Sequence, residues 1–164
     1  MAPTTGFNNK LYRNTGSVAT PVWSEVNQIG DVSIDGLTRG LAELKRRATQ
    51  FTLNLPSLIQ SITASFRLHH GLDSSTFTAL RQAFFAATVI EWAIMDGDID
   101  VAAAEGLRIP MLVSDFPWEQ PLEDVSGHDV KLAVGYMTSG GNEVVPSWLV
   151  VSQNLQWTTT TTTT

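Results

Sequence analysis

Apolar and polar residues alternate in four segments of the chain, which span residues 49–55, 62–69, 107–113 and 130–136. A period of two residues turns successive side chains to opposite faces of a β-strand. Each segment therefore predicts a strand with one buried and one polar face. The second segment is the clearest, because its even positions are apolar and its odd positions are Thr63, Ser65, Arg67 and His69.

Three further segments have a β-like composition with a less regular alternation, at residues 22–34, 88–95 and 143–151. In the first, Gly30 lies where the phase shifts, which predicts a bulge or bend. In the last, Pro146 lacks the amide hydrogen that a sheet ladder uses, so this strand should lie at an edge or begin at Ser147. For the same reason, we expect Pro56 to interrupt the strand at 49–55.

One segment has the period of an α-helix. Its apolar residues recur at intervals of three, four and three, at Phe77, Leu80, Phe84 and Ala87. A polar residue just before it (Asp73, Ser74 or Ser75) can accept a hydrogen bond from a free backbone N–H and cap the helix. The sequence therefore predicts one helix at about residues 74–87.

The predicted elements amount to about seven to eight strands and one helix. This set predicts a mainly β fold, either a β-sandwich or a partly closed barrel, in which the helix covers one opening. Residues 1–152 are expected to form a single domain, of which residues 1–9 are an extended N-terminal arm. Residues 38–47 are compatible with a short helical turn or a loop between strands.

Residues 153–164 end in seven consecutive threonines. Threonine favours an extended backbone, but such a run offers no pattern to bury. We therefore predict a disordered or loosely extended C-terminal tail. A strand that pairs with a neighbouring subunit is the alternative.

Composition excludes several classes of protein. The chain lacks an apolar run of about 18 residues, so no membrane span is predicted. Its first residues lack the apolar centre of a secretory signal. The absence of cysteine excludes disulfides, thiolate metal sites and cysteine nucleophiles, and fits a protein made in a reducing cytoplasm.

The net charge of −6 is unevenly distributed. Residues 1–90 hold eight Lys and Arg against five Asp and Glu, whereas residues 91–164 hold two against eleven. Such a division favours head-to-tail contacts between copies, although two sets of solvated loops are an equal alternative. An acidic chain is also poorly suited to gripping nucleic acid, because that requires clustered Lys and Arg.

A joint rich in proline and acidic residues, SDFPWEQPLED at residues 114–124, separates two of the alternating segments. The chain places a helix, a strand, a hairpin, this joint and a final strand pair in that order. In both respects it resembles the major tail-tube protein of long-tailed bacteriophages. The resemblance extends over roughly residues 51–151.

The resemblance implies a structural protein of the virion tail, made in the host cytoplasm. Copies would form six-fold rings whose strands join into a continuous inner barrel, and stacked rings would form a hollow tube for genome ejection. The partners would be copies of the chain and other tail proteins, with DNA as transient cargo and no membrane. The resemblance also assigns inter-ring contact to residues 35–47.

Two groups of residues are candidates for contacts between subunits. A basic run can face an acidic neighbour, and an aromatic residue on the joint can act as an exposed anchor. The candidates are Arg39, Lys45, Arg46, Arg47, Trp118, Glu119, Glu123 and Asp124.

No arrangement in the sequence supports catalysis or metal binding. Residues 96–100 resemble the start of a calcium loop, but Val101 and Leu107 replace its required glycine and glutamate, so a hairpin turn fits better. The adjacent His69 and His70 would point to opposite faces of a strand and cannot bind one metal by themselves. A site formed by all three histidines, with His128, is the less favoured alternative to one half-buried and one exposed imidazole. The acidic residues of the joint lack a partner base or nucleophile. We therefore expect neither an enzyme nor a cofactor.

Two alternatives remain open. One is a related phage part, such as a tail terminator, a tube-initiating protein or a head-completion protein. The other is a carbohydrate- or protein-binding module, in which aromatic residues form a stacking platform at Trp92, Trp118, Tyr136, Trp148 and Trp157. Trp92, however, falls in the apolar phase of its strand and is expected in the core. The sequence does not separate contractile from non-contractile tails.

Overall fold

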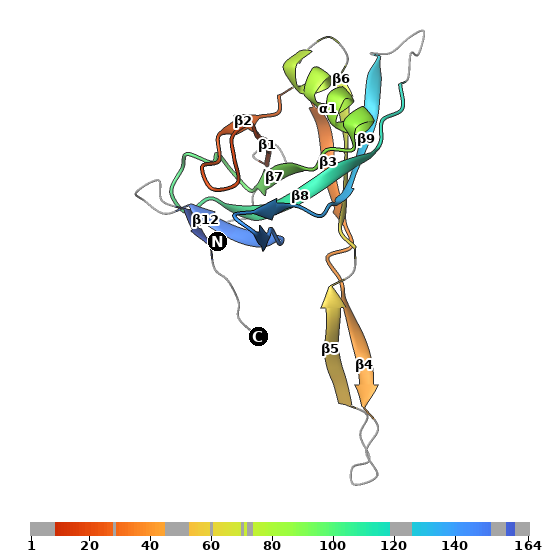
Figure 1. The fold of residues 1–164 in the computed structure, drawn as a ribbon, viewed down its shortest axis with the longest axis vertical. Helices are drawn as coiled ribbons and strands as arrows, with labels where there is room; N and C mark the ends of the chain where they lie inside the picture. Colours follow the sequence, from red (N-terminus) through yellow and green to blue (C-terminus); the bar gives the residue numbers. More distant parts are fainter. Residues whose placement is uncertain are drawn as a thin grey trace.

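The structure is a computed structural model that describes residues 9–27, 29–44, 53–59, 61–69, 71, 74–118, 126–151 and 157–159. These residues form thirteen β-strands and one α-helix, which confirms the prediction of a mainly β chain with one helix (Figure 1). Helix α1 spans Ser74–Ala86, as its periodicity predicts. More strands are present than predicted because four contain only two or three residues, and because no strand was predicted at Lys10–Asn14 or Arg39–Leu44.

Nine strands belong to one antiparallel sheet. In spatial order its main path is β2 (Trp23–Glu25), β1 (Lys10–Asn14), β7 (Ile90–Met95), β8 (Glu105–Asp115), β9 (Gly127–Val134), β6 (Thr63–His69) and β3 (Ile29–Asp35). Off this path, β12 (Ser147–Val151) pairs with β8 and with β13 (Trp157–Thr159). Two separate hairpins are β4 (Arg39–Leu44) with β5 (Leu53–Ile59), and β10 (Thr138–Ser139) with β11 (Asn142–Glu143).

Strand β8 is long enough to take part in two layers of the fold, one with β7 and β12 and the other with β9, β6 and β3. Its residues 105–108 pair with β12 and its residues 106–111 with β7, whereas residues 111–115 pair with β9. The layers face each other across the core, since Trp92 of β7 lies 5.9 Å from Phe66 of β6 between ring centroids. Among the described strands the sheet does not close into a barrel, because β2 and β3 stand unpaired with each other at its ends. The arrangement is consistent with the predicted sandwich.

The core lies between these layers and is closed at one end by α1. Trp92, Ile109 and Val130 are fully buried, which confirms the prediction made for Trp92. Helix α1 buries Leu80 and Ala83 on its inner face and contacts β8 (Figure 1). Of the four apolar positions that predicted the helix, Leu80 is buried and Phe77 is half-buried, whereas Phe84 is 37% exposed and Ala87 lies just after the helix.

A buried polar network fixes the loop between β1 and β2. Glu91 is 2% exposed and forms an ion pair with Arg108, and it also accepts a hydrogen bond from Asn14 Nδ2 at 2.9 Å. Arg108 donates to the Val18 carbonyl at 2.9 Å, while Asn14 Oδ1 accepts from the backbone N–H of Val22 at 3.0 Å. Because a buried charge is costly without a partner, these groups depend on one another.

Several local predictions are confirmed. The register of β3 against β6 shifts between Ile29 and Val32, so Gly30 lies in the expected irregularity. Strand β12 begins at Ser147, directly after Pro146. Residues 96–100 form turns and bends between β7 and β8, as expected for a connection of this composition.

Three predictions require correction. Strand β5 runs through Pro56, which lies next to a register shift opposite Leu41, so its missing N–H is accommodated where the ladder is already irregular. Residues 39–44 form a strand, not a helical turn or a loop. In the C-terminal tail, Trp157–Thr159 pairs with β12 of the same chain and is not loose, whereas the rest of the tail lies outside the described residues. The N-terminal arm at residues 1–8 lies outside the described residues.

Candidate assembly surface

The two end strands of the sheet have unpaired edges. Among the described residues, β3 pairs only with β6 and β2 pairs only with β1. The backbone N–H and C=O groups on the outer edge of such a strand can hydrogen-bond to another chain. Each edge is therefore a possible point of sheet extension by a second copy.

The β4–β5 hairpin projects away from the two layers (Figure 1). It carries Leu41, which is 65% exposed, and Arg39, which is also exposed. Leu37, just before the hairpin, is 57% exposed. A projecting element that carries large exposed apolar side chains is more typical of a contact surface than of a surface that stays in water.

The neck of this hairpin, where the chain leaves β3 and enters β4, depends on Gly36. Its φ angle is +87°, a left-handed conformation that favours glycine. A Cβ atom at this position would also collide with the carbonyl oxygen of Ser61. The close approach of these two backbone segments fixes the point at which the hairpin leaves the sheet.

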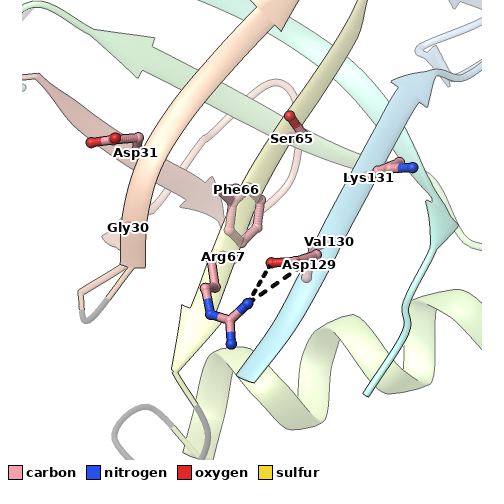
Figure 2. A pocket seen from close by; sticks show the side chains of 8 residues that line it. All are labelled: Gly30, Asp31, Ser65, Phe66, Arg67, Asp129, Val130 and Lys131. Atoms are coloured by element: carbon pink, nitrogen blue, oxygen red, sulfur yellow. Dashed lines mark hydrogen bonds and ion pairs between the residues drawn. The ribbon is translucent and has the colours of Figure 1, made fainter. Parts of the chain in front are cut away.

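Strands β3, β6 and β9 have one apolar and one polar face. Phe66, Leu68 and Val130 point into the core, whereas the residues between them point outward. The polar face contains a shallow groove of about 430 Å³ (Figure 2). It is lined by Gly30, Asp31, Ser65, Phe66, Arg67, Asp129, Val130 and Lys131.

Both cations that line this groove have carboxylate partners. Arg67 Nη1 donates to Asp129 Oδ1 at 3.3 Å and to Oδ2 at 3.5 Å. Lys131 Nζ lies 3.6 Å from Asp115 Oδ2. All four side chains are between 30% and 62% exposed, so water screens the pairs and each is weak.

A second charged cluster joins β1, β2 and the turn after β7. Lys10 Nζ donates to Asp98 Oδ2 at 3.1 Å and to Glu25 Oε2 at 3.2 Å. The backbone N–H of Asp100, and then Lys10, lower the pKa of Asp98 below its usual value. Asp98 and Glu25 raise the pKa of Lys10, and burial raises the pKa of Tyr12.

Comparison with solved structures shows where this fold occurs. The tail of an empty gene transfer agent particle, computed with C6 symmetry, contains a chain that matches with a TM-score of 0.63 at 13% identity, over 81% of this chain and 95% of that one. The SPP1 tail tube matches with a TM-score of 0.61 at 12% identity, over 80% and 76% of the two chains. The six-fold symmetrised baseplate of the anti-feeding prophage matches with a TM-score of 0.60 at 9% identity, over 92% and 98%.

The chain has a tail-tube-type fold. At these identities the likeness concerns the fold, and it confirms the resemblance predicted from the sequence at that level. No family model matches the chain, and no curated protein sequence matches it.

Two of the predicted contact residues fall within the described part of this tail-tube-type fold. Arg39 is exposed at the start of β4. Trp118 is 57% exposed and donates from Nε1 to Ser126 Oγ at 3.1 Å. Its ring lies 5.6 Å from that of His128, which in turn lies 4.9 Å from Phe77 of α1.

Helix α1 and the β4–β5 hairpin lie at opposite ends of Figure 1, so the structure does not bring Arg39 and Trp118 together. The other predicted contact residues lie outside the described residues. They are Lys45, Arg46, Arg47, Glu119, Glu123 and Asp124.

His128 belongs to the core. It is 1% exposed, its ring stacks on Phe116 at 4.8 Å, and its Nδ1 lies 3.2 Å from the Pro117 carbonyl oxygen. In the described part of the chain, no three His, Asp or Glu side chains come together as a metal-binding group. None of the helices described is long and apolar enough to cross a membrane.

Sequence reasoning missed the exposed Leu41 and the pairing of Arg67 with Asp129. Alternation places Arg67 on the polar face of its strand, and that signal was visible. The pairing needs the register of β6 against β9, which places Arg67 directly opposite Asp129. Two strands separated by some sixty residues do not reveal such a register in sequence alone.

Proposed function

We propose that this chain is a structural subunit that self-associates into stacked rings, six-fold in symmetry, which form the hollow tail tube of a virion. The genome would pass through this tube during ejection. The proposal is supported first by the open sheet, whose end strands offer unpaired backbone groups. Ring closure between copies would satisfy those groups.

The strongest support for the proposal is that β3, β6 and β9 have one apolar and one polar face. When sheets from several copies join edge to edge, one face must point to the inside of the ring. The apolar face is covered by the chain's own core. The polar face is therefore the one able to line a water-filled channel, in which DNA would be transient cargo.

The projecting β4–β5 hairpin suits contact between rings. A structural element that leaves the body of a subunit can reach a copy in the next layer, and Leu41 supplies apolar area for that contact. Such a heterologous contact repeats without closing and produces a filament. Six-fold symmetry is supported by the symmetry of the matching tail and baseplate structures.

One observation favours a second candidate, a single-ring component of the tail. The chain of the anti-feeding prophage baseplate covers 92% of this protein, against 80% for the SPP1 tail tube. A component that initiates or ends a tube would form one ring and would not stack on itself.

Negative-stain electron microscopy of the purified full chain, together with light scattering, separates these candidates. Long hollow tubes are the expected result for a tube subunit. Isolated closed rings would favour the single-ring candidate. A protein that stays monomeric at high concentration would contradict both.

A further inference from the structure

Arg67 lies in a slot on the polar face of β3, β6 and β9 (Figure 2). A Cβ atom on Gly127 would lie 3.1 Å from Arg67 Nε, and one on Gly30 would lie 3.6 Å from Arg67 Cβ. The glycines on the two neighbouring strands thus leave the space that this side chain occupies. Arg67 is flattened against the sheet and is 30% exposed.

The Asp129 carboxylate lies beside the guanidinium in this slot. The two residues are direct partners in the β6–β9 register, and Arg67 Nη1 reaches both carboxylate oxygens, at 3.3 and 3.5 Å. Asp129 is part of the sheet itself, so its carboxylate remains beside Arg67 at a high effective concentration. A phosphate from solution would have to displace it.

We infer that Asp129 neutralises Arg67 so that the polar face of β3, β6 and β9 does not retain DNA. This inference rests on the proposed function, since it matters only where DNA passes this face. Protein–DNA affinity depends mainly on the number of Lys and Arg that neutralise phosphates. A ring repeats each residue once per subunit, so one unpaired arginine per chain would form a ring of cations around the channel.

Lys131 is paired with a carboxylate in the same way as Arg67. It lines the same groove and lies beside Asp115. With both cations paired, the remaining carboxylate of the groove, Asp31, leaves this surface without excess positive charge. The groove would therefore admit DNA and release it.

Asp129→Asn is the direct test, because it removes the charge and keeps the volume. Binding of a short fluorescent duplex DNA to the full chain is measured by anisotropy over a range of salt concentrations. We expect Asp129→Asn to bind more tightly than wild type, with a plot of log K against log salt steeper by about 1 for each released arginine that reaches a phosphate.

Asp35→Asn is the matched control. Asp35 is exposed on the same face of β3 and takes part in none of the described ion pairs. The substitution changes the net charge equally but releases no cation, so its binding should stay near that of wild type. The double variant Arg67→Gln/Asp129→Asn should also return to wild-type binding.

Exposed ion pairs contribute little to stability, so Asp129→Asn should fold; circular dichroism checks this. If it does not fold, Asp115→Asn releases Lys131 and carries the same expectation. Equal binding by Asp129→Asn and Asp35→Asn, or tight binding by wild type that Arg67→Gln abolishes, would overturn the inference.

Microscopy of the same samples separates this failure from a failure of the proposed function. Tubes in which Asp129→Asn binds no more DNA than wild type refute the shielding role alone. The absence of rings and tubes refutes the assembly, while the binding data still decide whether Asp129 shields Arg67.

Discussion

Charged residues in this chain occupy two environments, and burial decides what each contributes. Glu91 and Arg108 lie beneath the loop between β1 and β2, with side chains 1% and 13% exposed. Lys10, Glu25 and Asp98 lie at the surface, where water screens them. The buried pair should therefore contribute most to stability, whereas the surface cluster should contribute little and its contribution should depend on pH.

Removal of one partner from the buried pair leaves the other charge uncompensated. We expect Glu91→Leu to destabilise the protein by about 3–5 kcal/mol, as for other broken buried pairs. The double variant Glu91→Leu/Arg108→Met removes both charges and should recover much of that loss. Urea denaturation measures both variants, and an equal loss in the single and double variants would contradict the argument.

The surface cluster makes a prediction about acid. The folded-state pKa of Asp98 is lowered from 3.8, so its contribution to stability is present above pH 4 and disappears as the pH falls through the folded pKa. We expect Asp98→Asn to lower the melting temperature slightly at pH 7. The difference from wild type should shrink progressively below pH 4, and a constant difference from pH 7 to pH 3 would argue against this account.

At the level of elements, the parts of the fold that the sequence predicts are those whose signal lies within one short segment. Helix α1 and strand β6 were predictable because each shows a complete period on its own. Strand β5 was predicted to stop at Pro56, because a single sequence does not show that the ladder has a register shift there. The partner of Arg67 was likewise unpredictable, since pairing between distant strands is set by the whole sheet.

The neck of the β4–β5 hairpin gives a prediction at this scale. Gly36→Ala combines an unfavourable positive φ with a collision against Ser61, so we expect a loss greater than the 1–3 kcal/mol of backbone strain alone. Gly140→Ala is the control, since Gly140 also has a positive φ, of 58°, but has no atom within 4 Å of the new Cβ. Thermal unfolding compares the two, and equal losses would mean that the backbones can separate.

At the level of the whole molecule, assembly depends on surfaces that the folded chain does not cover. If the hairpin joins rings, Leu41→Asp should block stacking while leaving single rings and the fold intact. Val101→Asp is the control, because Val101 is also exposed, at 57%, but lies in the connection between β7 and β8. Electron microscopy should then show short or single rings for Leu41→Asp and long tubes for Val101→Asp; tubes of equal length would exclude this role for Leu41.

Strand β8 has a further consequence for a protein built to repeat. Because it pairs with β7 and β12 along one part and with β9 along another, a slip of β8 by one residue would turn its own buried side chains outward in both layers at once. Intermediate arrangements, with one layer correct and the other displaced, are thereby penalised. Every correctly folded copy should therefore hold the two layers in the same relative arrangement. A long polymer would then be built from uniform subunits.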